Sequence, residues 1–237
     1  QWGTIWMRAG SLDNEINHAT IKNGIIGVLV DSIGFPSSPT LKLQNTEIYN
    51  HSSYGILGRE TNIEASNLVV GNAGLASLAA TIGGTYNFTH STFANFWNGS
   101  LRQLPAVIVN NFFAYNDEAG QEIIETRNLH AANFTNCIFD GNNNIEFILD
   151  KVEGGGIFNY NISNCMIQFN DINNSFEDST ELDFTNSFYQ NNILNGFTHF
   201  RDTQKNDFII GEESDAINKA IASPFTSDIL GIDRTMS

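Results

Sequence analysis

Two stretches, Phe134-Thr-Asn-Cys-Ile-Phe139 and Ile162-Ser-Asn-Cys-Met-Ile167, follow one six-residue pattern that decides the fold. Further stretches on both sides share its apolar first and sixth positions. The eight copies are residues 16–21, 43–48, 63–68, 88–93, 108–113, 134–139, 162–167 and 184–189. Their starts lie 20 to 28 residues apart. A period of about 24 residues is typical of a solenoid.

The columns of this alignment predict what each position does. The apolar first and sixth positions are expected to point inward, and the small fourth position to lie inside a bend. The third position holds His18 and His90 in two copies. In five copies it is an asparagine: Asn45, Asn110, Asn136, Asn164 and Asn186. Stacked asparagine side chains can bond to each other as a ladder, because identical polar residues then lie one above another.

These features predict an all-β fold, a right-handed parallel β-helix of about eight to nine coils of ~24 residues. Residues 1–206 are expected to form the coils, truncated on the N-terminal side. Residues 207–237 break the pattern and are expected to form a capping tail over the last coil.

The charge excludes two classes of partner. With 11 basic and 26 acidic residues, the net charge is −15, whereas nucleic acids and anionic membranes attract clustered Lys and Arg. No apolar run approaches the roughly 20 residues of a membrane span.

The repeated pattern resembles the right-handed parallel β-helix proteins of the pectin-lyase-like superfamily. Residues 1–32, which begin Gln-Trp-Gly-Thr-Ile-Trp, and residues 224–231 are similar to secreted bacterial β-helix lipoproteins of unknown function. The resemblance implies a secreted protein, or one at the cell surface or outer membrane. It also implies a lipid anchor on an N-terminal part that precedes this sequence. It does not select a function, because β-helices host many.

Five basic residues recur near the end of the second strand of a coil: Arg59, Arg102, Arg127, Lys151 and Arg201. Stacked on the outside, they would form a cationic line that binds an acidic polysaccharide. The alternative is plain ion pairing with the acids beside them in sequence, which are Glu60, Glu125, Asp150 and Asp202.

An enzymatic alternative is a polysaccharide lyase or glycoside hydrolase. Lyases resembling this fold use Arg or Lys as the base and carboxylate-bound calcium to acidify the sugar, so calcium is expected only for a lyase. The candidate acids are scattered: Glu125, Asp140, Asp150 and Asp171. Hydrolases need two close carboxylates, and no Asp-Asp doublet occurs. We therefore expect no metal site and no other cofactor, and favour a protein without catalysis.

The fifth column predicts an apolar strip on the outside, formed by Phe112, Ile138, Met166 and Phe188. Such a strip needs a cover. The segments 114–130 and 141–160 are one candidate, and a partner protein or a missing part of the same chain is the other. Trp2, Trp6 and Trp97 are candidates for stacking on sugar rings. For Trp2 and Trp6 the favoured alternative is packing against coils that precede this sequence. Cys137 and Cys165 are expected to be core thiols.

Three functions remain open at this stage. The first is a non-catalytic envelope or extracellular protein that binds a glycan or a protein partner along the solenoid face. The second is the lyase or hydrolase acting on an acidic polysaccharide. The third is a structural scaffold subunit of an envelope complex.

Overall fold

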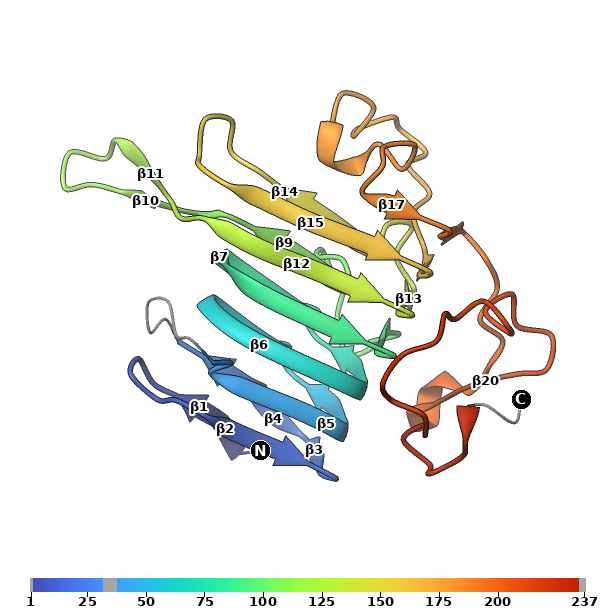
Figure 1. The fold of residues 1–237 in the computed structure, drawn as a ribbon. Coiled ribbons are helices and arrows are strands. Elements are labelled where there is room, and N and C mark those ends of the chain that lie inside the picture. The colour runs from blue at the N-terminus through green and yellow to red at the C-terminus, as the bar shows by residue number, and fades with distance from the viewer. Residues whose placement is uncertain (1, 32–37, 235–237) are drawn as a thin grey trace.

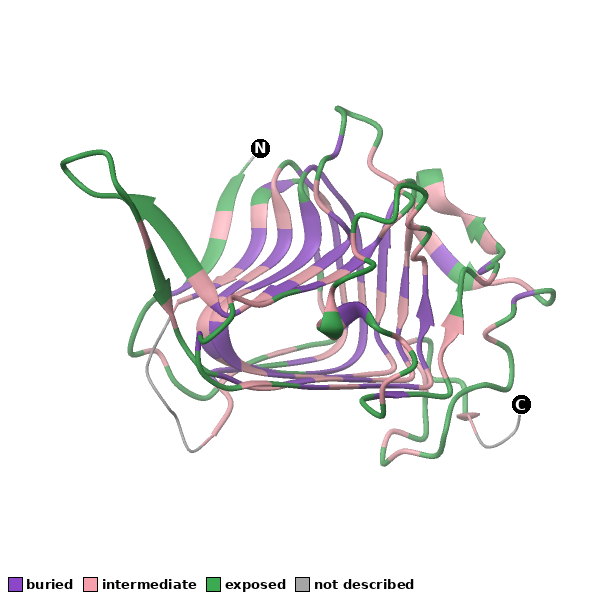
Figure 2. Cartoon of the chain, turned by 90° about the horizontal axis from the view of Figure 1, so that it is seen from above, coloured by how far each residue is buried: buried purple, intermediate pink, exposed green. Residues whose placement is uncertain are grey.

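The computed structural model describes residues 2–31 and 38–234 and consists mainly of a large parallel sheet that curls round on itself (Figures 1 and 2). Residue 1, residue 32 and the last three residues of the expected tail lie outside the described residues. The strands of the curled sheet are β1 (Trp2–Met7), β2 (Asn14–Asn17), β3 (Thr20–Lys22), β4 (Gly24–Val30), β5 (Leu41–His51), β6 (Tyr54–Ala73), β7 (Ala76–Thr89), β8 (Thr92–Asn95), β9 (Val107–Asn110), β12 (Leu129–Thr135), β13 (Ile138–Gly141), β14 (Phe147–Asp150), β15 (Phe158–Ser163), β16 (Met166–Ile167), β17 (Tyr189–Gln190) and β18 (Ile193–Leu194).

Four strands and two short 3-10 helices lie outside that sheet. They are the hairpin β10 (Phe112–Asn116) and β11 (Glu122–Thr126), the hairpin β19 (Phe200–Asp202) and β20 (Asp207–Ile210), and the helices η1 (Thr180–Leu182) and η2 (Thr203–Lys205). The all-β expectation is therefore confirmed.

Parallel pairing divides the curled sheet into three faces. The first face runs β1, β4, β6, β7, β9, β14. The second runs β2, β5, β6, β7, β12, β15, β17. The third runs β3, β5, β6, β8, β13, β16, β18. The second and third faces each join seven segments, fewer than the eight to nine coils expected.

The corner between the second and third faces carries the ladder position. Seven residues there share a left-handed backbone with φ between 48° and 56°: His18, Asn45, Asn67, His90, Asn136, Asn164 and Asn191. Asparagine tolerates this conformation better than most residues. Within the ladder, Asn67 Nδ2 donates to Asn45 Oδ1 at 2.9 Å. Asn45 Nδ2 also donates to Oδ1 of Asn17, the residue before His18, at 3.1 Å. The prediction holds for His18, Asn45, His90, Asn136 and Asn164.

Three of the eight predicted copies were wrong in register. Leu43 pairs with Ala65 rather than Ile63, so Asn67 occupies the ladder position. Ile162 pairs with Tyr189 rather than Phe184, so Asn191 replaces Asn186 there.

The copy at 108–113 belongs to another face. Ile108 pairs with Ala79 and Ile148 in the first face, which places Asn110 at a different corner. Strands of the first face also bury alternate apolar residues. The six-residue pattern therefore recurs in them, although this face has no ladder position.

Phenylalanines fill the core enclosed by β7, β12, β13 and β14. Phe88 pairs with Phe134 in the second face, and their rings stack with centroids 5.2 Å apart. Phe139 stacks on Phe147 at 4.9 Å. All four are almost fully buried. Such aromatic pairs contribute about 0.5–1.5 kcal/mol each beyond the area they bury.

Two segments leave the curled sheet. The β10–β11 hairpin projects from one end of the second face (Figure 2). The C-terminal segment, residues 196–234, runs back beside the third face instead of stopping at the last strands (Figure 1).

Candidate functional site

Four of the five predicted basic residues are partly exposed, and each is in an ion pair. Arg59 pairs with Asp31, and Arg201 with Asp207 at 3.0 Å. Arg127 contacts Glu125 at 3.1 Å and Glu60 at 3.6 Å. Lys151 contacts Glu181 at 3.0 Å and Glu153 at 3.8 Å. These contacts match the ion-pairing alternative, although several partners come from distant turns rather than from the adjacent acids.

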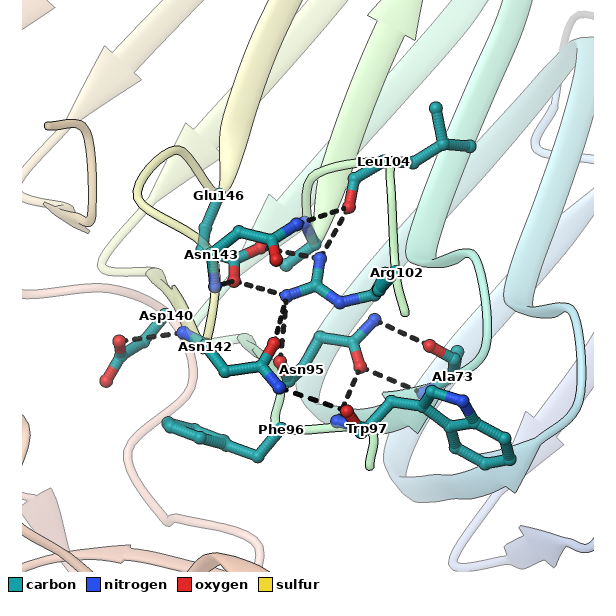
Figure 3. A network of polar contacts seen from close by, with 12 residues as sticks. Ala73, Asn95, Phe96, Trp97, Arg102, Leu104, Asp140, Asn142, Asn143 and Glu146 are labelled. Atoms are coloured by element: carbon teal, nitrogen blue, oxygen red, sulfur yellow. Dashed lines mark hydrogen bonds and ion pairs between the residues drawn. The ribbon is translucent and has the colours of Figure 1, made fainter. Parts of the chain in front are cut away.

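Arg102 does not lie on the outside, and the five basic residues therefore form no single exterior line. Its side chain is 1% exposed and forms an ion pair with the fully buried Glu146 (Figure 3). Arg102 Nη1 donates to Glu146 Oε2 at 2.8 Å and to the Leu104 carbonyl at 2.6 Å. Burial raises the pKa of Glu146, and Arg102 opposes that rise. A buried pair of this kind is structural, because an isolated buried charge is costly.

The same network fixes the backbone of Trp97 (Figure 3). Arg102 Nη2 donates to Asn142 Oδ1 at 2.9 Å, and Asn142 Nδ2 donates to the Trp97 carbonyl at 3.0 Å. Asn95 Oδ1 accepts from the Trp97 amide at 3.3 Å and from the Ala73 amide at 3.1 Å. The loop that carries Trp97 is thus anchored to buried charge.

Trp97 and Trp2 line one open cleft although 95 positions separate them. The cleft has a volume of about 360 Å³ and is lined by Trp2, Asn23, Asn50, Ser52 and Trp97. We call it the tryptophan cleft. Trp2 Nε1 donates to the Lys22 carbonyl at 2.7 Å, and Trp97 Nε1 to Ser100 Oγ at 3.0 Å. Both indoles are thereby held in place.

The polar groups of the tryptophan cleft are amides and a hydroxyl, with no charged side chain. Asn23 and Asn50 have a left-handed backbone, and the Asn23 amide donates to the Tyr49 carbonyl. Asn23 comes directly after β3 and Asn50 lies in β5, each one position beyond the paired residues Lys22 and Tyr49, so their backbones lie about one strand spacing, ~4.8 Å, apart. Among residues 2–31 and 38–234, neither side-chain amide has a hydrogen-bond partner. The cleft therefore offers two rings and two unpaired amides.

The predicted apolar strip exists in part. Ile138 and Met166 pair with each other, and the column continues to Ile193 on one side and, beyond the polar Thr92, to Val69 on the other. Phe112 lies in the projecting hairpin, and Phe188, 52% exposed, precedes β17. Both were misplaced because their copies of the pattern were out of register.

The cover of the strip is the C-terminal segment rather than 114–130 or 141–160. Its backbone bonds to successive ladder residues: Lys219 to Asn164, Ile221 to Asn136, and Ser227 to Asn67, each at 2.9 Å. Ser223 Oγ lies 2.7 Å from His90 Nε2. The ladder asparagines are the feature of the sequence that could have indicated this contact, because their outward side-chain amides need hydrogen-bond partners.

The candidate acids do not gather. Glu125 pairs with Tyr115 and Arg127, Asp140 accepts from Thr198 at 2.6 Å, and Asp171 accepts from the amides of a turn. Asp150 lies at the end of β14. No group of three His, Cys, Asp or Glu residues suited to a metal ion occurs in the described part of the chain. Cys137 and Cys165 are buried free thiols, as expected.

The chain matches no protein-family model, and no curated protein or solved structure is significantly similar to it. No helix within the described residues has the length and apolar character needed to cross a membrane.

Proposed function

We propose that this chain is a right-handed parallel β-helix of the pectin-lyase-like kind that binds a neutral glycan in the tryptophan cleft without cleaving it. The observation that carries the proposal is the meeting of Trp2 and Trp97 beside the unpaired amides of Asn23 and Asn50. Three faces of parallel pairing, visited in a constant order, support the β-helix assignment.

The chemistry of the cleft fits a sugar. Indole rings stack on the apolar C–H faces of pyranoses, and side-chain amides donate to and accept from their hydroxyls. A few well-placed polar groups among aromatic rings are the usual composition of a small-molecule site. The lining carries no charge, and the chain carries −15. A neutral glycan is therefore favoured over a polyuronate.

Binding without cleavage is proposed because the cleft holds no carboxylate. Hydrolysis of a glycosidic bond needs two carboxyl groups on either side of it, and the lining residues supply none. An extracellular or cell-surface location, with the lipid anchor implied by the resemblance, forms part of the proposal because glycans of this kind are exposed there.

The test is affinity electrophoresis through gels that contain neutral glucans, mannans, xylans or polygalacturonate. We expect retardation by a neutral polysaccharide, with loss of retardation in Trp97→Ala and Trp2→Ala. Trp6→Ala is the matched control, because Trp6 is 52% exposed and does not line the cleft. Unchanged far-ultraviolet circular dichroism would show that each variant folds.

Two outcomes would overturn the proposal. One is unaltered mobility in every neutral gel. The other is retardation by polygalacturonate alone that persists in Trp97→Ala and disappears in Arg127→Ala/Lys151→Ala. That second outcome would restore the acidic polysaccharide and the basic residues as its site.

A further inference from the structure

A second cavity, which shares no lining residue with the tryptophan cleft, lies on the outside of the third face. Its volume is about 470 Å³. The floor consists of six residues that are in register on successive strands: Glu47, Val69, Thr92, Ile138, Met166 and Ile193. Five strand spacings make this floor about 24 Å long. The cavity is therefore long and narrow.

The walls come from the C-terminal segment. Phe208, Ile209 and Ile210 of β20 contribute to the lining, and so do Ile229 and Leu230. On the β20 side, Asn72 Nδ2 donates to Asn206 Oδ1 at 2.8 Å and to the Thr203 carbonyl at 3.1 Å. On the other side, the ladder hydrogen bonds hold residues 219–227. The segment is thus held along both edges of the floor while the middle stays open.

Apart from Val69, the apolar residues of the floor lie on its last three strands. Val69, Ile138 and Ile193 are only half-buried by the chain itself, and Met166 is more deeply covered. Apolar surface left open in a narrow cavity favours an apolar occupant at about 25 cal/mol per Å² removed from water.

One charged group of the lining stands out. Glu47 accepts from Thr20, Asp207 pairs with Arg201, Asp228 accepts from nearby amides, and Arg234 donates to carbonyls. In the described part of the chain, the ammonium of Lys219 alone among these groups has no partner. Lys219 is exposed, and its carbonyl accepts from Asn164 at the level of Met166. It can meet an anionic head group at the apolar end.

We propose that this cavity binds a single long acyl chain with an anionic head group. The acyl chain lies along the floor from Met166 toward Val69, and the head group pairs with Lys219. No residue is shared with the tryptophan cleft. The acyl site and the glycan site therefore stand or fall separately.

The experiment is isothermal titration calorimetry with hexadecanoate below its critical micelle concentration. We expect saturable one-to-one binding to the full chain. Ile138→Trp places an indole on the floor and should weaken binding at least tenfold. Leu101→Trp adds the same ring at a site that is 88% exposed and should leave affinity unchanged. If Ile138→Trp does not fold by circular dichroism, Val69→Trp, at the far end of the acyl path, replaces it.

The head group is tested with Lys219→Gln and with hexadecanol. We expect Lys219→Gln to weaken hexadecanoate binding about tenfold and to leave hexadecanol binding unchanged. The acyl site is refuted by the absence of saturable binding, or by equal affinities in the folded floor variant and Leu101→Trp. Equal hexadecanoate affinity in the wild type and Lys219→Gln refutes the assignment of the head group.

Discussion

Asn136 and Ile221, 85 residues apart, are joined by a reciprocal pair of hydrogen bonds, in which the side-chain amide of Asn136 donates to the Ile221 carbonyl and accepts from its N–H, each at 2.9 Å. The side-chain amide of Asn136 thus bonds to the backbone of the C-terminal segment as the backbone of a neighbouring strand would. Because Asn136 also has φ 56°, one residue turns the corner and holds the cover.

This double role predicts the effect of two substitutions. Asn136→Ala removes both hydrogen bonds, at about 1 kcal/mol each, and replaces asparagine with a residue that tolerates the left-handed region less well. Asn136→Gly removes the hydrogen bonds but tolerates the backbone. We expect urea unfolding to show a larger loss for Asn136→Ala than for Asn136→Gly. An Asn136→Ala variant within 0.5 kcal/mol of the wild type, a limit set by ordinary surface substitutions, would contradict this account.

The buried pair Arg102–Glu146 predicts strong coupling. Arg102→Met or Glu146→Gln alone leaves a buried partner unmatched and should cost about 3–5 kcal/mol. The double variant Arg102→Met/Glu146→Gln should cost less than the sum of the two single changes. Urea unfolding of all four proteins completes the double-mutant cycle. Additive costs would mean that the two side chains act independently.

Gly141 is predicted to accept no side chain. A Cβ there would lie 2.2 Å from Glu146 Oε1 and 2.5 Å from the Asn95 carbonyl, so the network around Trp97 must shift. Gly141→Ala should therefore lower the unfolding midpoint and weaken glycan retardation. Gly3→Ala is the control, since nothing lies within 4 Å of its Cβ position. Equal midpoints for the two variants would show that the network yields without cost.

Acid should weaken the attachment of the C-terminal segment at His90. Burial, with Arg234 nearby, lowers the pKa of His90 to about 4. The unfolded chain takes up the proton near pH 6.5. Stability from neutral His90 is therefore complete above pH 6.5 and is lost as the pH falls toward 4.

The measurement is the free energy of unfolding of wild type and His90→Asn between pH 7 and 4. Asparagine suits the ladder and does not titrate, so the variant should lose less stability over this range. Amide exchange of residues 219–227 should also rise with acid in the wild type only. Parallel pH profiles would assign the acid sensitivity to other groups.

The repeat predicted the strand class, the inward columns and most of the ladder, because period and residue type act locally. Register failed at 63–68 and 184–189, because the residues that occupy the first position of the pattern are Ala65 and Tyr189, two and five positions further along the chain. Ile108 failed because a first-face strand has the same alternation. The contact of Trp2 with the cleft of Trp97, and the pair Arg102–Glu146, depend on stacking and loop closure. No local pattern encodes such contacts.

The path of the C-terminal segment bears on how the molecule unfolds. In a stacked repeat, each unit touches only its neighbours, and the ends can unravel independently. Here the C-terminal segment bonds in turn to Asn164, Asn136, His90 and Asn67. Melting any one of these strands must loosen an attachment shared by the others. The C-terminal segment thus links strands that would otherwise depend only on their neighbours, so the molecule should melt in one cooperative transition. A proteolytic cut after residue 211 should divide that transition into steps.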